Sequence, residues 1–227
     1  MRSETVTPRR QSRAFRQILV NSGLVTLLLL ALYAGSVLLE ANGLELDNES
    51  IWYAIRASGV VAYLLLAASS VWGILLSGRL VRARVSPALA LELHTYLAWT
   101  AVGMTVYHAY LLLFSDFFDY GVADLLIPFL GPYEPLAVGL GIIGTYLMIL
   151  TSATFYLVQR IGYRAFKLVH YLTYAAFLLA TVHSWLAGTD SVLFNPLYLA
   201  ASMGVLLLTV ARLLARQRRT FAKIYTS

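Results

Sequence analysis

The sequence predicts an all-α membrane protein, a polytopic six-transmembrane-helix bundle with both termini in the cytoplasm. Of its 227 residues, 59% are hydrophobic and only 12% are charged, against about 25% charged residues in ordinary soluble domains. The apolar residues form six runs, each near the ~20 residues that a helix needs to cross a bilayer. This composition excludes a soluble enzyme, and no run alternates polar with apolar residues as a membrane β-strand does.

The six predicted spans are residues 17–39, 53–77, 88–114, 135–159, 165–187 and 196–215. Pro87, Pro135 and Pro196 are expected at the first position of their helices, where the missing N–H of proline does no harm. Residues 1–16 are expected to be a basic cytoplasmic segment that is retained rather than cleaved, and residues 216–227 a cytoplasmic tail. The expected location is the plasma membrane, with membrane lipid as the surrounding solvent.

The basic residues set the predicted orientation. Every Lys and Arg except Arg56 lies before the first span, after the last, or in the loops and adjoining span ends on one side of the membrane, whereas the opposite loops contain acidic residues and no basic ones. Basic residues favour cytoplasmic loops, so this pattern explains the net charge of +6 without nucleic-acid binding. The chain contains no cysteine, which excludes disulfides, iron–sulfur clusters and covalently attached heme.

Gly139, Gly141 and Gly144 match the spacing of a dinucleotide-binding loop. They lie inside a continuous apolar span, however, and not between a strand and a helix, as that loop requires. Small residues in such a span allow close helix packing, and we assign these glycines to packing.

All four histidines lie in two spans that run in the same direction, His94 and His108 in the third span, His170 and His183 in the fifth. Ionisable residues at membrane depth are costly and usually functional. The intervals of 14 and 13 residues correspond to about 21 and 20 Å along a helix. His94 and His170 therefore share an inner level, and His108 and His183 an outer level. Two imidazoles from facing helices are the ligand set of a six-coordinate b-type heme.

The 13-residue interval has a geometrical difficulty. Fourteen residues return to within about 40° of the same helix face, but thirteen end about 140° away. A local irregularity is therefore predicted between His170 and His183. Zinc or copper is a weaker alternative, because each level offers two histidines without a third ligand at the same depth, apart from Glu92 near the inner end of the third span, and structural zinc usually takes four.

Arg56 lies near the outer end of the second span, at the depth of His108 and His183. We expect its guanidinium to bind a propionate of the outer heme, since it can hold a carboxylate with two parallel hydrogen bonds; the alternative is that it reaches the outer headgroups. The candidates for the inner propionates are Arg79, Arg82, Arg84, Arg164 and Lys167.

The residues described above resemble the ferric reductase-like transmembrane domain, which ferric reductases, NADPH oxidases and the heme subunit of the periplasmic methionine sulfoxide reductase system share. The resemblance is carried by the six spans, the histidine intervals, the RASG stretch at residues 56–59, and GYRAFKLVHYLTYAAFLLATVHSW in the fifth span. It covers residues 17–215. It implies two hemes b, with His94 and His170 as axial ligands of the inner iron, His108 and His183 as those of the outer iron, and Arg56 on an outer propionate.

The resemblance implies an oxidoreductase that passes electrons through the two hemes to an extracytoplasmic acceptor, such as ferric iron, oxygen or a partner reductase. The short segment after the last span leads us to expect no flavin or nicotinamide domain of its own, so a separate FAD or FMN protein or a membrane quinol would be the donor. The sulfoxide reductase subunits typically lack the histidine found here as His94, which favours a general two-heme protein. The alternative is a heme-free membrane carrier or assembly subunit with structural or proton-relaying histidines.

Overall fold

The computed structural model describes residues 47–78, 85–188 and 191–225 continuously, with isolated positions between 27 and 42. The predicted first span and the basic segment before it lie outside these continuous ranges. Within the described residues the chain is helical and contains no strand, as predicted. In this described part of the chain, four helical segments are long and apolar enough to cross a membrane: Asn48–Gly78, Pro87–Phe114, Pro135–Ala187 and Leu193–Ala215. The protein is therefore an all-α membrane protein, while the cytoplasmic placement of both termini stays a prediction.

The first two continuously described helices begin at polar caps. α2 (Asn48–Gly78) starts earlier than predicted because the Asp47 carboxylate accepts a hydrogen bond of 2.8 Å from the Ser50 N–H, which satisfies a free donor of the first turn. α3 (Pro87–Leu111) follows Ser86, whose hydroxyl accepts from the Leu89 N–H at 3.3 Å. Pro87 occupies the first turn of α3, as predicted.

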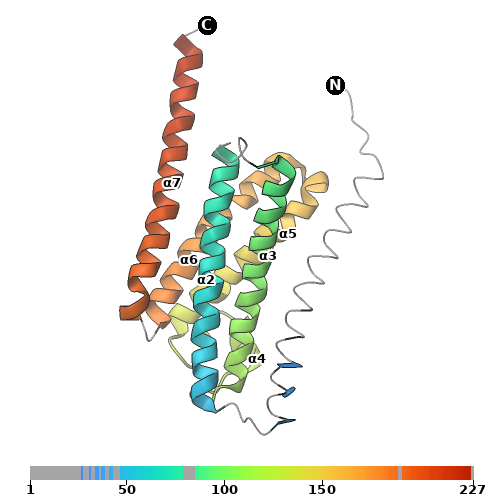
Figure 1. Ribbon diagram of the computed structural model, residues 1–227, viewed down its shortest axis with the longest axis vertical. Helices are drawn as coiled ribbons and strands as arrows, with labels where there is room; N and C mark the ends of the chain where they lie inside the picture. The colour runs from blue at the N-terminus through green and yellow to red at the C-terminus, as the bar shows by residue number, and fades with distance from the viewer. Residues whose placement is uncertain are drawn as a thin grey trace.

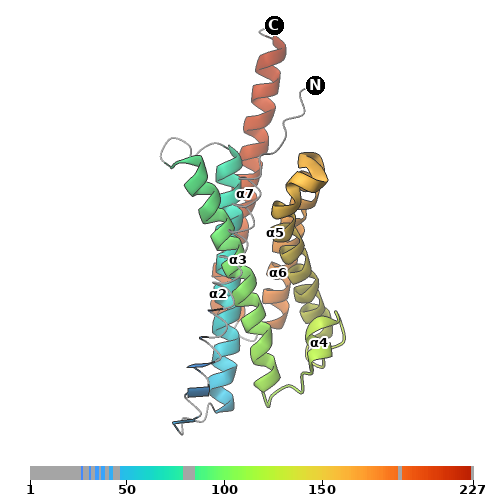
Figure 2. The same ribbon diagram turned by 90° about the vertical axis from the view of Figure 1, so that its right-hand side faces the viewer.

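The fourth and fifth predicted spans lie in one long helical segment with a bend. α5 (Pro135–His170) contains Gly162 at φ 80° and ψ 157°, a backbone conformation that glycine adopts without steric cost. α6 (Leu172–Ala187) then continues the segment. At 1.5 Å per residue, Pro135–Ala187 would be about 80 Å long if straight, more than twice the ~30 Å hydrocarbon core. The bend at Gly162 instead brings α6 back alongside α5 (Figures 1 and 2).

The last helix differs from the prediction at both ends. α7 (Ser191–Tyr225) begins before Pro196 and contains this proline, whereas the sequence placed Pro196 at the first helical position. Because Pro196 lies close to the start, its missing N–H removes one helical hydrogen bond and does not end the helix. α7 also continues well past residue 215, so most of the predicted cytoplasmic tail is helical, and Figure 1 shows it projecting beyond the other helices.

The helices form two hairpins, α2 with α3 and α5 with α6, which face each other (Figure 2). α7 packs beside α2 and α6. One buried cluster joins α2, α6 and α7 and consists of Tyr63, Ala67, Ile74, Phe177, Tyr198 and Val205. A second joins α3, α5 and α6 and consists of Ala101, Val102, Met148 and Ala176. The candidate site lies between the two hairpins.

The connection from α3 to α5 closes one end of the bundle. It contains a 3-10 turn, η1 (Leu112–Phe114), and a short helix, α4 (Val122–Leu126), neither of which was predicted as a separate element. We call residues 115–134 the outer strap. The two ends of the bundle differ in charge. The acidic side chains of the strap lie at this end, whereas the opposite end, where α5 bends, carries the basic residues Arg160, Arg164, Lys167 and Arg212. Arg56, early in α2, is a basic residue at the acidic end.

Candidate functional site

The structure brings the four histidines together in the two predicted pairs. The ring centroids of His108 and His183 are 6.3 Å apart, and those of His94 and His170 are 6.2 Å apart. In each pair, one imidazole comes from α3 and the other from the α5–α6 hairpin. The pairs lie at two levels of the bundle because His94 and His108 are separated by about 21 Å along α3, an unbroken helix.

The separation within each pair fits one metal ion held between two imidazoles. A bond from a histidine nitrogen to a metal is about 2 Å long, and that nitrogen lies about 1.2 Å from the ring centre, so two opposed rings on one ion have centroids about 6 Å apart. The measured 6.2 and 6.3 Å agree with this value. In a direct hydrogen bond between the two rings, the donor and acceptor nitrogens would be about 3 Å apart. The measured centroids are too far apart for that nitrogen–nitrogen distance.

At the outer level, both histidines are anchored through Nδ1. His108 Nδ1 lies 2.8 Å from the Ile55 carbonyl oxygen of α2, and His183 Nδ1 lies 3.0 Å from the Ala137 carbonyl oxygen of α5. A carbonyl oxygen only accepts hydrogen bonds, so Nδ1 must carry the proton in both rings. Nε2 then keeps its lone pair, and this is the arrangement of a histidine that binds a metal through Nε2.

At the inner level, the anchoring is weaker. His94 Nδ1 lies 3.4 Å from the Ser69 hydroxyl, near the limit for a hydrogen bond. His170 Nδ1 is buried and makes no hydrogen bond with any described residue. The His170 ring is instead stacked on Phe166, with centroids 5.2 Å apart and an interplanar angle of 25°. The two levels therefore share their histidine separation but differ in how the rings are held.

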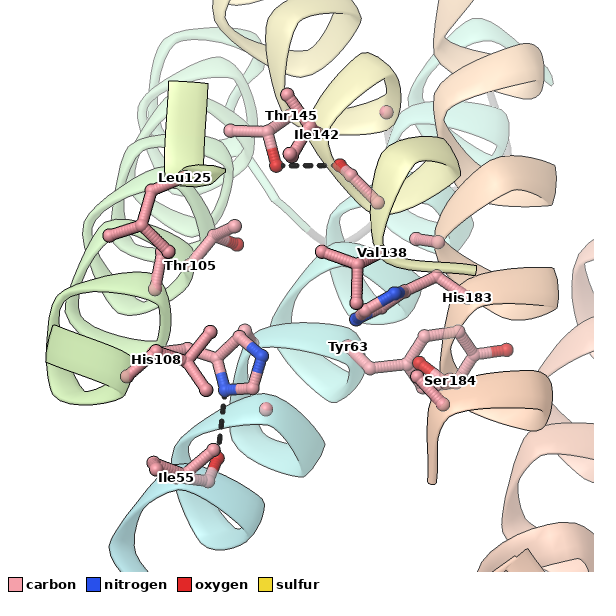
Figure 3. Close-up of a pocket in the computed structure, with 18 of the residues that line it drawn as sticks. Ile55, Tyr63, Thr105, His108, Leu125, Val138, Ile142, Thr145, His183 and Ser184 are labelled. Atoms are coloured by element: carbon pink, nitrogen blue, oxygen red, sulfur yellow. Dashed lines mark hydrogen bonds between the residues drawn. The ribbon is translucent and has the colours of Figure 1, made fainter. Parts of the chain in front are cut away.

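The outer pair lines an apolar cavity of about 550 Å³, within the range of about 300 to 1,000 Å³ typical of cofactor and ligand pockets. Figure 3 shows His108 and His183 projecting into this cavity from opposite sides, with Val138 and Ile142 of α5 on one wall and Tyr63 of α2 on another. The site thus combines two opposed imidazoles with a largely hydrocarbon wall.

The inner pair lines a smaller cavity of about 220 Å³. Hydroxyl side chains contribute much of its wall: Ser69, Ser70, Ser77, Thr95, Thr151, Ser152 and Thr173. Lys167 and Arg212 also line it, from α5 and α7 respectively. The inner cavity therefore has two cationic side chains at its wall and a more polar lining than the outer cavity.

Comparison with known protein families identifies the family of this chain. Residues 58–181, more than half of the chain, match the family described as "Ferric reductase like transmembrane component". The chain belongs to this family. The matched segment contains His94, His108 and His170, and His183 lies just beyond it. No curated protein matches the chain, and no solved structure does.

Ferric reductase-like domains generally bind heme, and the histidine pairs are compatible with that group. Among the described residues, no three or more His, Asp or Glu side chains gather in a group that would hold a metal ion. Each level therefore contains two imidazoles, and two is the number of ligands that a heme iron needs beside its porphyrin nitrogens.

The inner and outer cavities of this ferric reductase-like bundle are adjacent. Leu66, Met148 and Ala176 line both cavities, so a thin apolar partition separates them. Beside it, Tyr63 lines the outer cavity and Phe177 the inner one, and their rings are stacked with centroids 5.7 Å apart. The Tyr63 hydroxyl lies 3.1 Å from the Thr181 hydroxyl, which satisfies this polar group in the core.

The charged residues near the cavities only partly match the predicted set. Arg56 lines the outer cavity, and its guanidinium carbon lies 5.8 Å from the centroids of both the Trp52 and the Tyr53 rings. Of the candidates for the inner propionates, Lys167 lines the inner cavity and Arg164 does not. Arg79, Arg82 and Arg84 lie outside the described residues. Arg212 was missed because it lies near the end of a span, where a basic residue is ordinarily explained by orientation.

The outer strap covers the outer cavity through tyrosine hydrogen bonds. Tyr120 donates to the Tyr133 carbonyl at 3.1 Å, and Tyr133 donates to the Ala187 carbonyl at the end of α6 at 3.2 Å. Burial raises the pKa of both phenols above the ordinary value, so both hydroxyls stay protonated as donors at neutral pH. The sequence alone does not predict this network, because it depends on backbone carbonyls.

Proposed function

We propose that this protein is a b-type heme electron-transfer protein of the cell membrane. His94 and His170 would bind an inner heme, and His108 and His183 an outer heme. Each heme, when bound, supplies an iron that gains and loses one electron without changing its two histidine ligands. The protein would then pass electrons from one side of the bilayer to the other, as an oxidoreductase subunit.

The observation that carries this proposal is the repeated pair of opposed imidazoles. Two pairs with nearly equal centroid separations of 6.2 and 6.3 Å are what two sites for the same six-coordinate iron require. The outer rings also have Nδ1 bound to a carbonyl, which leaves Nε2 for the metal. A role as a heme-free carrier would explain buried histidines, but it does not require this equal spacing.

The residues around the two cavities suggest how the propionates would be held. Arg56 would bind a propionate of the outer heme, and Lys167 with Arg212 those of the inner heme, because these cations line the respective cavities. A carboxylate is costly at membrane depth unless a cation or several donors compensate it. These residues would therefore fix the orientation of each heme as well as its charge.

The distribution of charge supports a direction for electron transfer. The end with Arg160, Arg164, Lys167 and Arg212 would face the cytoplasm and receive electrons from a flavoprotein or a quinol. The acidic end would deliver them to ferric iron, oxygen or a partner reductase outside. The thin partition formed by Leu66, Met148 and Ala176 would keep the two hemes close enough for transfer between them.

Electron transfer across a sealed vesicle tests this function. The purified full-length protein is reconstituted into liposomes loaded with ferricyanide, and dithionite is added outside. We expect ferricyanide reduction, followed at 420 nm, to be much faster than in liposomes without protein. Reduction no faster than in empty liposomes, with protein that contains heme, would reject transmembrane transfer.

Two variants serve as controls for this experiment. The double variant His108→Ala, His183→Ala removes the outer pair and should reduce the rate to that of empty liposomes. Leu206→Ala changes a side chain of α7 that is 55% exposed in the bundle and should retain the rate. A histidine double variant that transfers electrons at the wild-type rate would show that the outer pair is not required and would contradict the proposal.

A further inference from the structure

Three glycines lie directly against three of the four histidines. A Cβ placed on Gly59 of α2 would lie 3.0 Å from His108 Cε1, and one on Gly73 would lie 3.0 Å from His94 Cε1. A Cβ on Gly141 of α5 would lie 2.8 Å from His183 Nδ1. Real Cβ atoms rarely come this close to a neighbour. Any side chain at these positions would therefore displace the imidazole or the helix that carries it.

Each of these glycines is the fourth residue after the hydrogen-bond partner of the same histidine. His108 Nδ1 contacts the carbonyl of Ile55, four residues before Gly59. His183 Nδ1 contacts the carbonyl of Ala137, four residues before Gly141. The same interval recurs at the inner level as a third pair, where His94 Nδ1 contacts the hydroxyl of Ser69 and the glycine is Gly73.

Helix geometry explains this interval. The carbonyl of residue i accepts its helical hydrogen bond from the N–H of residue i+4. The Cα–Cβ bond of residue i+4 is tilted toward the N-terminus of the helix, so its side chain covers the side of that carbonyl. When residue i+4 is glycine, the second lone pair of the carbonyl is open to a donor from a neighbouring helix.

We propose that Gly59, Gly73 and Gly141 are positioning residues for the heme ligands. Each one opens the backbone or hydroxyl oxygen four residues earlier to a histidine Nδ1, which fixes the ring and directs Nε2 toward the iron. This proposal rests on the proposed function for its consequence on heme binding. The contact between glycine and histidine itself holds with or without a heme.

Other residues of the bundle show that the arrangement is selective. Gly144, also in α5, has its nearest Cβ contact at an ordinary 3.4 Å, to Leu179. Gly204 of α7 has nothing within 4 Å. In α5, the Cβ positions of Gly139, Gly144 and Gly162 have no close contact with His170, and the buried His170 Nδ1 has no hydrogen-bond partner among the described residues. A close glycine and an Nδ1 contact therefore occur together at His94, His108 and His183, whereas His170 lacks the Nδ1 contact.

The test uses alanine at each glycine in the full-length protein. Gly59→Ala and Gly141→Ala should weaken binding of the outer heme, and Gly73→Ala should weaken binding of the inner heme. The reason is that loss of the hydrogen-bond partner of a metal-binding histidine typically lowers affinity about 10- to 100-fold. The midpoint potential of the affected heme should rise, because the ligand loses basicity. Gly204→Ala, in α7 and lining neither cavity, is the matched control and should leave both hemes unchanged.

The readouts are heme content per chain, a redox titration followed by absorbance, and the low-spin signals of the oxidised protein in electron paramagnetic resonance. Unchanged signals in all three variants, with a wild type that contains two hemes, would overturn this proposal and leave the proposed function intact. A wild type without heme would overturn the proposed function instead.

Nitrogen-15 resonances of the histidines test the same contact in heme-free protein. We expect wild-type His108 and His183 to carry their proton on Nδ1, and Gly59→Ala to change only His108. If Gly59→Ala does not fold, the wild-type spectrum still shows which nitrogen of each ring carries the proton. Protonation of either ring on Nε2 in the wild type would contradict the proposal.

Discussion

His170 and His183 lie in two different helical segments, because the helix is interrupted at Tyr171. α5 ends at His170 and α6 begins at Leu172. The Tyr171 N–H is shared between the carbonyls of Lys167 and Leu168, and the Tyr174 N–H donates to the Tyr171 carbonyl, three residues back. This tight turn has about 3.0 residues per turn, so it adds about 20° per residue relative to an α-helix. It moves His183 toward the face that His170 occupies, as the 13-residue interval requires.

The position of this turn leads to a first prediction. Insertion of one alanine after Tyr171 would rotate His183 by about 100° relative to His170 and separate one histidine from its partner on α3. We expect the purified variant to lose at least one heme per chain in a pyridine hemochrome assay. An insertion after Pro128, in the outer strap, is the control and should keep both.

The two sites should differ in heme affinity. The outer histidines are both bound to carbonyls, whereas His170 Nδ1 has no partner among the described residues. Because such a partner contributes about 10- to 100-fold to affinity, we expect hemin titration of the heme-free protein to fill the outer site first. His94→Ala should remove the weaker-binding phase of this titration. Removal of the tighter phase by His94→Ala would show that the assignment of the two levels is reversed.

The cations near the cavities should tune the two hemes separately. A positive charge close to a heme favours the reduced iron, so its removal should lower the midpoint potential of the nearest heme. We expect Arg56→Gln to lower the potential of the outer heme, and Lys167→Gln or Arg212→Gln that of the inner heme. Arg160→Gln is the control, since Arg160 lines neither cavity. Equal shifts in all four variants would indicate a general effect of net charge.

The tyrosine hydrogen bonds of the outer strap should be sensitive to alkaline pH. Burial raises the pKa of Tyr120 and Tyr133, so the stabilisation from their protonated forms is fully present below about pH 10, the ordinary tyrosine value, and is lost as pH rises through the raised values. Absorbance at 295 nm should show one late-titrating phenol fewer in Tyr120→Phe, and one fewer in Tyr133→Phe, than in the wild type.

Tyr133→Phe removes the hydrogen bond to Ala187 and should weaken the closure of the strap by about 1 kcal/mol. Limited proteolysis between residues 115 and 134 measures this loss as faster cleavage than in the wild type. Cleavage at the wild-type rate would mean that the hydrogen bond does not hold the strap closed.

The sequence predicted those features that depend on local patterns. Apolar runs defined the spans, Pro87 and Pro135 marked helix starts, and equal depths of the histidines on parallel helices defined the two pairs. The same reasoning failed at Pro196, because a proline near the start of a helix is compatible with more than one starting residue. The 13-residue interval indicated a helix irregularity between His170 and His183, but the sequence did not place it at Tyr171.

Other features depend on contacts between helices and were not predictable in this way. Gly141 was assigned to packing, and the structure shows that it packs against His183 itself. Gly59 lies four residues after Ile55, but the importance of this interval appears only once His108 is placed beside α2. Arg212 lines the inner cavity because α7 packs beside α2 and α6, a neighbour relationship that one sequence does not specify.

The number of hemes per chain in the purified full-length protein tests the central claim most directly. The pyridine hemochrome assay should give two hemes b per chain for the wild type, one for His108→Ala, His183→Ala, and one for His94→Ala, His170→Ala, with low-spin six-coordinate spectra throughout. Protein expressed with ample heme that is folded but contains no dithionite-reducible b-type heme would contradict the account.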